Sequence, residues 1–230
     1  MGNICFKRHR HKPATIRQAV WLYFRFSLSF RDVEEILAER GVDVSYEAIR
    51  SWTRKFGPQI ARNLKRRRPV PSPRWHLDEM VSRIEGKHMY LWRAVDDEGE
   101  VLGTTVHRRR DAAAATSFLA KLSRDQPVKP QTITTDGLRS YVAAAEKLGV
   151  VWLHRPGRLR ENNRIENSHL PIRQRERQML GFKSQVSAQR FLTTHAAIYN
   201  TFYTQRHLTA RAALREFRAT AHQAWQAAAS

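Results

Sequence analysis

The sequence predicts an α/β protein in which a small all-helical domain precedes a larger domain built on a five-stranded mixed sheet. In the first part of the chain, apolar residues recur at helical spacing. A short segment rich in prolines and cations follows, and after it the apolar pattern changes to that of strands alternating with helices. We therefore expect a helical domain over residues 1–62, a linker over 63–74, an α/β domain over 75–205 and a C-terminal helix over 206–230.

The chain carries a large excess of positive charge. Its 230 residues include 41 Lys and Arg against 21 Asp and Glu, a formal net charge of +20. Such a domain repels itself unless it meets a polyanion, and nucleic acid is the commonest one, ahead of an anionic membrane surface. No apolar run has the length of a membrane span, and none follows the basic N-terminus as in a signal peptide. With Cys5 as the single cysteine, we expect a cytoplasmic, DNA-facing protein without a membrane partner.

Capping patterns mark the first two helices of the helical domain. Thr15 and Gln18 form a capping-box pattern at the start of the first helix, and Ser29 and Asp32 form another before the second. Gly41 stands where the second helix should end, because glycine takes the left-handed conformation without steric cost. The pattern predicts two short helices joined by tight turns.

A third helix should begin at Ser45, with Ile49, Trp52 and Phe56 on its apolar side. Its other side is polar and basic. The residues of that side predicted to contact DNA are Arg50, Ser51, Arg54 and Lys55. This order of elements is that of a helix-turn-helix, which places its last helix in the major groove. The alternative is a three-helix bundle whose charges are simply solvated.

The predicted linker combines cations with prolines. Three prolines within five residues, at 69, 71 and 73, cannot continue a helix and favour an extended chain. The four cations before them are expected to add phosphate contacts. They are Lys65, Arg66, Arg67 and Arg68.

The order of elements in the second domain predicts its fold. The predicted strands cover residues 75–84, 89–95, 101–107, 132–135 and 150–153. Helices over 112–122 and 141–148 separate the last three, and another helix follows the fifth strand. This order is that of the ribonuclease H-like fold. Two further helices, over 187–203 and 209–228, are expected to cover the sheet or to pair subunits.

Three acidic residues stand out by their position in this fold: Asp78, Asp136 and Glu166. Asp78 lies within a strand of core-type residues, where a charge is costly unless it is paired or binds a cation. Asp136 ends the fourth strand, which neighbours the first, so the two carboxylates should lie close together. Glu166 begins the helix after the fifth strand. Glu79 and Asp96 are further candidates.

Carboxylates that converge without histidine or cysteine favour a hard ion, Mg²⁺ or Mn²⁺. Two such ions about 3.5–4 Å apart stabilise the attacking and leaving oxygens of an in-line phosphoryl displacement. The acids therefore predict cleavage of a DNA strand by water, then attack of the freed 3′-hydroxyl on target DNA. Local alternatives remain: an arginine partner for Asp78, a turn role for Asp136, and Glu161 or Glu176 in place of Glu166.

At these residues the sequence resembles the DDE transposases of bacterial insertion sequences, specifically the insertion sequence six family. The matching stretches are residues 29–41, 75–79, 90–96, 134–137, 162–166 and 180–184. The resemblance implies a catalytic triad of Asp78, Asp136 and Glu166. It also implies binding of the element's terminal inverted repeats, replicative transposition through cointegrates, and a place at the bacterial nucleoid.

Two local features depart from a simple match. Fewer residues lie between Asp136 and Glu166 than is typical of the family, and the deficit falls in a connecting region. Pro171 follows Glu166 closely, so we expect the helix to kink or restart near Ile172. Both features bear on the assignment of Glu166 as the third catalytic acid and not on the assignment of the two aspartates.

Arginines flank Glu166, and we expect them to bind substrate phosphates, with a solvated helix face as the alternative. They are Arg158, Arg160, Arg173, Arg175 and Arg177. His154 and His169 stand near the predicted site, but a lone histidine is more often a structural residue, so neither is included in the site. Core positions are expected for the tryptophans Trp52, Trp75, Trp92 and Trp152.

Because transposition must bring two DNA ends together, a homodimer or larger assembly on double-stranded DNA is expected. Two other functions stay open. One is a DNA-binding repressor whose catalytic domain has decayed. The other is a nuclease of the same fold that hydrolyses DNA without strand transfer.

Overall fold

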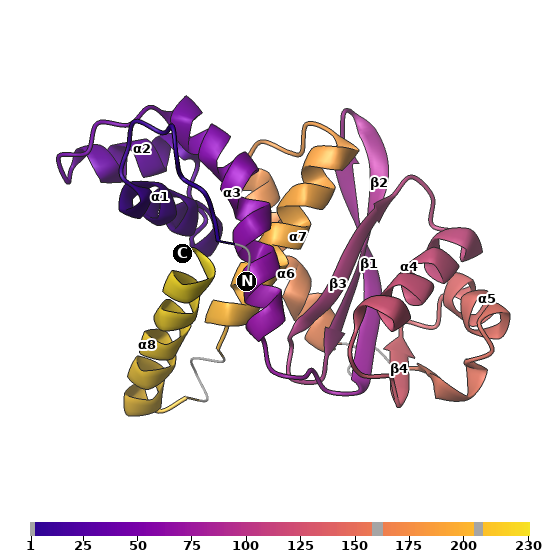
Figure 1. Cartoon of the computed structure of the whole chain (residues 1–230). Coiled ribbons are helices and arrows are strands. Elements are labelled where there is room, and N and C mark those ends of the chain that lie inside the picture. The colour runs from indigo at the N-terminus through magenta and orange to yellow at the C-terminus, as the bar shows by residue number, and fades with distance from the viewer. Residues whose placement is uncertain (1–2, 158–162, 205–208) are drawn as a thin grey trace. The chain divides into compact units, whose positions relative to one another are not determined.

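The computed structural model describes residues 3–157, 163–204 and 209–230, in two compact units (Figure 1). One unit joins residues 1–68 to residues 193–230, and the other comprises residues 69–192. The expected division placed residues up to 205 in the α/β domain. The structure instead groups residues from 193 onward with the N-terminal helices.

In its described residues, the first unit contains four helices and the last part of a fifth. They are α1 (Pro13–Arg25), α2 (Phe30–Ala38), α3 (Tyr46–Arg67), α8 (Arg211–Ala228) and the end of α7 (Gln185–Phe202). No helix in the described ranges is both long and apolar enough to cross a membrane.

Two of the three predicted helix starts are confirmed. Ser29 N donates to Asp32 Oδ2 at 2.7 Å, and Asp32 N donates to Ser29 Oγ at 3.1 Å, which completes the capping box of α2. Ser45 Oγ accepts from the backbone N–H of Ala48 at the start of α3. The box predicted at Thr15 is wrong, because α1 already begins at Pro13, whose fixed φ suits the first turn of a helix.

Helix α3 extends into the segment predicted as a linker. It continues through Arg67, so Lys65, Arg66 and Arg67 form its last turn, where cations interact favourably with the helix dipole. Arg68 is extended, with φ −67° and ψ 150°, because a residue before proline is disfavoured in the helical region. The extended connection therefore begins at Arg68 rather than at residue 63.

Long-range contacts explain why the C-terminal residues belong to the first unit. Asn63 of α3 donates its side-chain N–H to the carbonyl of Ala228 at 2.8 Å, and Ile4 N donates to Ser230 O at 3.0 Å. Thr194 of α7 lies against Gly57 of α3. These contacts join residues far apart in the sequence, and no local pattern predicts them.

The second unit confirms the predicted five-stranded mixed sheet of the ribonuclease H-like fold. Its strands are β1 (Arg74–Ile84), β2 (Lys87–Asp96), β3 (Val101–His107), β4 (Thr132–Thr135) and β5 (His154–Pro156). Their order across the sheet is β3-β2-β1-β4-β5. The β1–β2 and β2–β3 pairs are antiparallel, whereas β4 runs parallel to β1 and β5 runs parallel to β4.

Helices cover both faces of the sheet. On one face, α4 (Ala112–Asp125) and α5 (Arg139–Lys147) form an apolar core with Trp75, Leu77 and Trp92. Side chains alternate along a strand, so Asp78 lies on the other face, where α6 (Asn163–Gln178) packs on β1 and β2. Figure 1 shows α6 across the sheet from α4 and α5.

The expectation for the fifth strand is wrong, and that for the helix after it is wrong in part. Residues 151–153 form a 3-10 turn rather than the fifth strand, and Trp152 is 70% exposed instead of buried. A short apolar run does not distinguish a strand from a turn. Helix α6 continues through Pro171, so it does not restart near Ile172, and the kink expected there stays a prediction. Burial of Ile165 and Ile172 against the sheet offsets the lost backbone hydrogen bond.

Candidate active site

Sheet topology brings the two predicted aspartates together. Strand β4 pairs only with residues 74–76 of β1, so the edge of β1 beyond that point is left uncovered by β4. Asp136 directly follows β4, beside this edge. Ligand oxygens of Asp78, Glu79 and Asp136 lie within 4.8 Å of one another. The expected proximity of Asp78 and Asp136 is therefore present in the structure.

Asp136 also has the local role that its sequence suggests. Its Oδ1 atom accepts from the backbone N–H of Leu138 at 3.0 Å, and Gly137 adopts a φ of +82°, which only glycine adopts without strain. The tight turn holds the Asp136 carboxylate at the end of β4. Turn chemistry and membership of the site are thus compatible.

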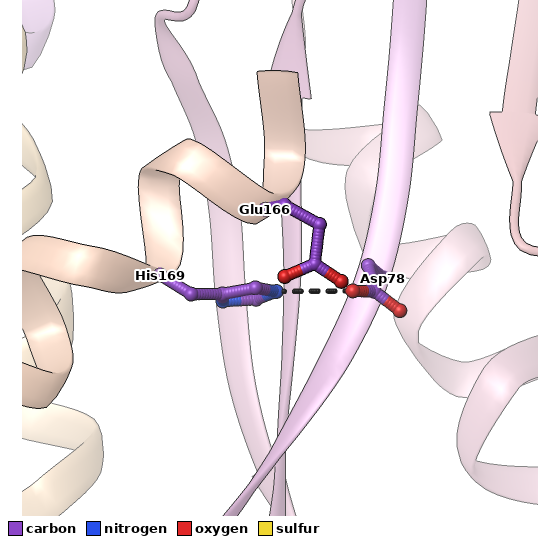
Figure 2. A group of neighbouring side chains, drawn as sticks. All are labelled: Asp78, Glu166 and His169. Carbon is purple, nitrogen blue, oxygen red and sulfur yellow. Dashed lines mark hydrogen bonds and ion pairs between the residues drawn. The ribbon is translucent and has the colours of Figure 1, made fainter. Parts of the chain in front are cut away.

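Helix α6 brings Glu166 and His169 to Asp78, as Figure 2 shows. Ligand atoms of these three residues also lie within 4.8 Å of one another. The two helical residues are three positions apart and so share one face of α6. His169 Nε2 lies 3.3 Å from Asp78 Oδ2. Within the described chain, the side chain found in hydrogen-bond contact with Asp78 is thus His169 rather than an arginine.

The structural role assigned to His169 was incomplete, because its ring belongs to this site. It is 1% exposed, and its Nδ1 atom is buried without a hydrogen-bond partner among the described residues. The spacing of Glu166 and His169 on one helix was the signal that could have identified it. The prediction left it out because a lone histidine is more often a structural residue.

The two groups share Asp78, so Asp78 is the centre of the site. Asp136 and Glu166 each come close to it from a different element, β4 and α6. The donors are mostly carboxylate oxygens, with one imidazole nitrogen, a set that suits a hard or borderline divalent cation. Asp78 is 7% exposed, and burying such a charge favours a cationic partner.

A buried network lies on the other face of β1, around Glu79. Its carboxylate accepts from Tyr141 Oη at 2.8 Å and from Arg110 Nε. Burial raises the pKa of Glu79, and the hydrogen bonds from Tyr141 and Arg110 oppose that rise. Arg110 Nη2 also lies 3.4 Å from Asp136 Oδ2. The network therefore links the sheet core to the aspartate pair.

Buried polar contacts fix α6 against the sheet. Arg93, opposite Asp78 in the β1–β2 register, is 1% exposed and donates from Nε to Ser168 Oγ at 2.9 Å. Ser82 Oγ donates to the carboxylate of Glu176. Glu176, considered as a rival to Glu166, thus has a structural partner. Glu161, the other rival, lies outside the described residues.

Besides the cations at 65–68, the residues predicted to bind DNA divide into four groups. Arg50, Ser51, Arg54 and Lys55 are exposed on α3 and line a hollow of about 500 Å³. Arg173 and Arg177 are exposed on α6. Arg175 is 1% exposed and lies over the Phe191 ring, 5.3 Å from its centroid, so its predicted phosphate contact is wrong. Arg158 and Arg160 lie outside the described residues.

A groove follows the uncovered edge of β1. It has a volume of about 1320 Å³ and is lined at one end by Glu79 and Arg110. Its other lining includes cations of the β1–β2 hairpin, of α6 and of the segment after α6. These are Arg83, Arg173, Arg177 and Lys183. The groove thus runs from Glu79 and Arg110, next to the acidic site, to a surface that carries these four cations together with Glu85 and Glu176.

Comparison with known proteins decides the family. The profile of the IS240-type transposases, described as a DDE domain, matches residues 72–205, a range that contains Asp78, Asp136 and Glu166. The chain belongs to the DDE transposases. A DDE domain implies dependence on divalent metal ions, and the acidic cluster around Asp78 fits that requirement.

The enzyme is similar to transposases of staphylococcal insertion sequences. It is 33% identical over 175 residues to the transposase for insertion sequence-like element IS431mec of Staphylococcus aureus (strain Mu50), covering 74% of this chain and 78% of that protein. It is 32% identical, with the same coverage, to the transposase for insertion sequence element IS257 in transposon Tn4003 of Staphylococcus aureus. These similarities place it in the insertion sequence six family.

Among solved structures, this transposase matches the simian T-cell lymphotropic virus intasome in complex with the PP2A regulatory subunit B56 gamma. The TM-score is 0.42 at 15% identity, with 81% of this chain and 66% of that chain covered.

Proposed function

We propose that this transposase cleaves DNA at the ends of its insertion sequence and joins them to target DNA, with Asp78, Asp136 and Glu166 as the catalytic acids. The observation that supports this proposal is the position of Asp78, which belongs to both groups of side chains close enough together to hold a metal ion. A carboxylate shared by two such groups suits a two-ion centre. Mg²⁺ or Mn²⁺ bound there would supply charge stabilisation of the attacking and leaving oxygens.

Each side chain has a separate task in this proposal. Asp78, from the rigid centre of the sheet, holds the site in place, and Asp136 closes it from the end of β4. Glu166 completes it from α6, which Ser168 and Arg93 fasten to the sheet. His169 orients the Asp78 carboxylate through the 3.3 Å contact of its Nε2 atom.

DNA binding is assigned to two separate surfaces. The exposed side of α3, with Arg50, Ser51, Arg54 and Lys55, would read the terminal inverted repeats as the last helix of a helix-turn-helix. The cations at the end of α3 and Arg173 and Arg177 of α6 would contact phosphates. The net charge of +20 supports a polyanionic partner. A homodimer or larger assembly in the bacterial nucleoid and a replicative, cointegrate-forming pathway belong to the same proposal.

A strand-transfer assay tests the function directly. Purified protein is incubated with Mn²⁺ and labelled DNA ending in the inverted repeats that flank its own coding sequence. We expect joined products that disappear in Asp78→Asn and Asp136→Asn and persist in Glu146→Gln, which changes an exposed glutamate of α5. Cleavage without joining would favour the nuclease, and a mobility shift without either would favour the repressor.

A further inference from the structure

Arg110 differs from its neighbours in the segment between β3 and α4. Arg108, Arg109 and Arg110 are consecutive, and all three are exposed residues. Within the described chain, the ion pairs found in this run are those of Arg110, with Glu79 and with Asp136. One arginine of three is thus directed to the active site by specific partners.

The anchor of Arg110 is buried and rigid. Glu79 is 9% exposed, and its two oxygens are used separately, Oε1 by Arg110 Nε and Oε2 by Tyr141 Oη. Tyr141 is fully buried and packs edge-on against Trp92, with ring centroids 5.3 Å apart. A buried carboxylate is costly unless it is paired. The core therefore fixes Glu79, and Glu79 fixes the arginine.

The guanidinium keeps donors for another ligand. Five N–H groups are available on arginine, and Nε is used on Glu79. The contact of Nη2 with Asp136 Oδ2, at 3.4 Å, is long for a charged hydrogen bond. The Arg110 side chain remains 40% exposed. Planar N–H groups at an accessible position are well suited to a phosphate oxygen.

The groove along β1 shows where such a phosphate would lie. Arg110 and Glu79 line the end of the groove at the acids, and Arg173, Arg177 and Lys183 line it further on. A phosphate backbone lying in the groove would meet a cation at both positions. Beside Asp136, a cation is also needed to offset repulsion between substrate phosphate and carboxylates.

We propose that Arg110 is a further substrate-binding residue of the active site, whose guanidinium contacts a phosphate of the DNA strand next to Asp136, with Glu79 and Tyr141 as the residues that position it. This inference rests on the proposed function, because it takes DNA as the substrate. It adds a residue outside the acidic triad. Arg109, adjacent and exposed, has no part in the contact.

The test is a phosphate-by-phosphate binding map. Single phosphates near the cleavage site are replaced by neutral methylphosphonates, and the affinity of each DNA is measured by fluorescence anisotropy in Ca²⁺. In the wild type and in Arg109→Ala, one substitution beside the cleavage site should weaken binding about tenfold. For Arg110→Ala, the same methylphosphonate should not lower DNA affinity further. Methylphosphonates at other phosphates should weaken the binding of this variant as much as they weaken that of the wild type. An identical map in the wild type and Arg110→Ala overturns the proposal.

Two further variants guard against a merely structural effect. Arg110→Ala leaves Glu79 buried without its cation, so the double variant Glu79→Gln/Arg110→Ala is mapped in parallel. It should lose sensitivity to the same single methylphosphonate as Arg110→Ala does. Tyr141→Phe should only partly reduce the effect of that methylphosphonate on DNA affinity, since Arg110 Nε keeps its hydrogen bond to Glu79. If the wild type cleaves DNA and Arg110→Ala gives the same phosphate map as the wild type, this inference alone is overturned. Protein that binds DNA with the expected map but never cleaves it overturns the proposed function alone.

Discussion

His169 Nε2 lies 3.3 Å from Asp78 Oδ2, and this contact joins a helix to a central strand across 91 positions of sequence. Both side chains are buried, at 2% and 9% exposure. Glu166 lies one turn earlier on the same helix, and its carboxylate approaches the same two side chains (Figure 2). Asp78 thus has neighbours in α6 and directly after β4, and the folded protein rather than any local motif assembles the site.

Divalent metal should stabilise the protein through Asp78. A ligand that binds the folded state alone adds about 2.7 kcal/mol at 100 times its Kd. We expect Mn²⁺ to raise the Tm of the wild type, measured by differential scanning fluorimetry, and to leave the Tm of Asp78→Asn unchanged. Glu146→Gln, the matched surface variant, should respond like the wild type. An equal Mn²⁺ response in Asp78→Asn would remove the metal centre from this site.

Replacing His169 should weaken metal binding without removing it. In the proposed site His169 orients a metal-ligating carboxylate, and losses of about 10- to 100-fold are typical for such partners. We expect His169→Gln to reduce Mn²⁺ affinity by that factor in calorimetric titration. His88→Gln, at an exposed position of β2, provides the control. A His169→Gln affinity equal to that of the control would leave His169 with a packing role only.

Replacing two arginines of α6 by alanine should have different effects, one on DNA binding and the other on stability. Arg173 is exposed, so Arg173→Ala should weaken DNA binding and lower the slope of log K against log salt by about 1, with unchanged stability. Arg175 is buried over Phe191, so Arg175→Ala should lower the free energy of unfolding. Salt-dependent anisotropy and urea unfolding on both variants separate these effects. The prediction fails if the two variants behave alike.

Gly57 tests the packing of the first unit. Alanine usually stabilises a helix interior relative to glycine by about 1 kcal/mol. A Cβ at this position of α3 would lie 3.0 Å from Phe24 Cε2, however, and an aromatic ring in a packed core cannot yield easily. We expect Gly57→Ala to destabilise the protein by about 1–3 kcal/mol in urea unfolding. Adding Phe24→Leu should recover part of the loss, and stabilisation by Gly57→Ala alone would contradict this packing.

His154 should make stability depend on pH. Burial lowers the pKa of His154, and the nearby Arg155 charge lowers it further, while its Nε2 contacts Thr135 Oγ1 at 2.8 Å. The folded state therefore favours the neutral ring. Its contribution is fully present above the unfolded pKa of 6.5 and is lost as pH falls below 6.5 through the folded pKa. In urea unfolding across this range, His154→Gln should show a smaller loss than the wild type and His88→Gln the same loss.

Local sequence patterns predicted most of the helices and strands, because helix starts and strand alternation depend on residues close together in the chain. The capping box at Ser29 and Asp32 fixed the start of α2, and strand alternation located β1 through β4 to within a few residues. Asp78 and Asp136 could be proposed as site residues for the same reason, since an acid within a core strand or at a strand end is visible in the sequence. Where a pattern was short, as at Trp152, the prediction was wrong.

What the sequence by itself determined is the kind and order of the elements and the positions of the acids within them. Only the tertiary structure decided which side chains meet. It buried Arg175 over Phe191, brought His169 to Asp78, and joined Glu79 to Arg110. Periodicity sets which face of a helix or strand is apolar, whereas the partner of a polar group depends on packing between segments far apart in the chain.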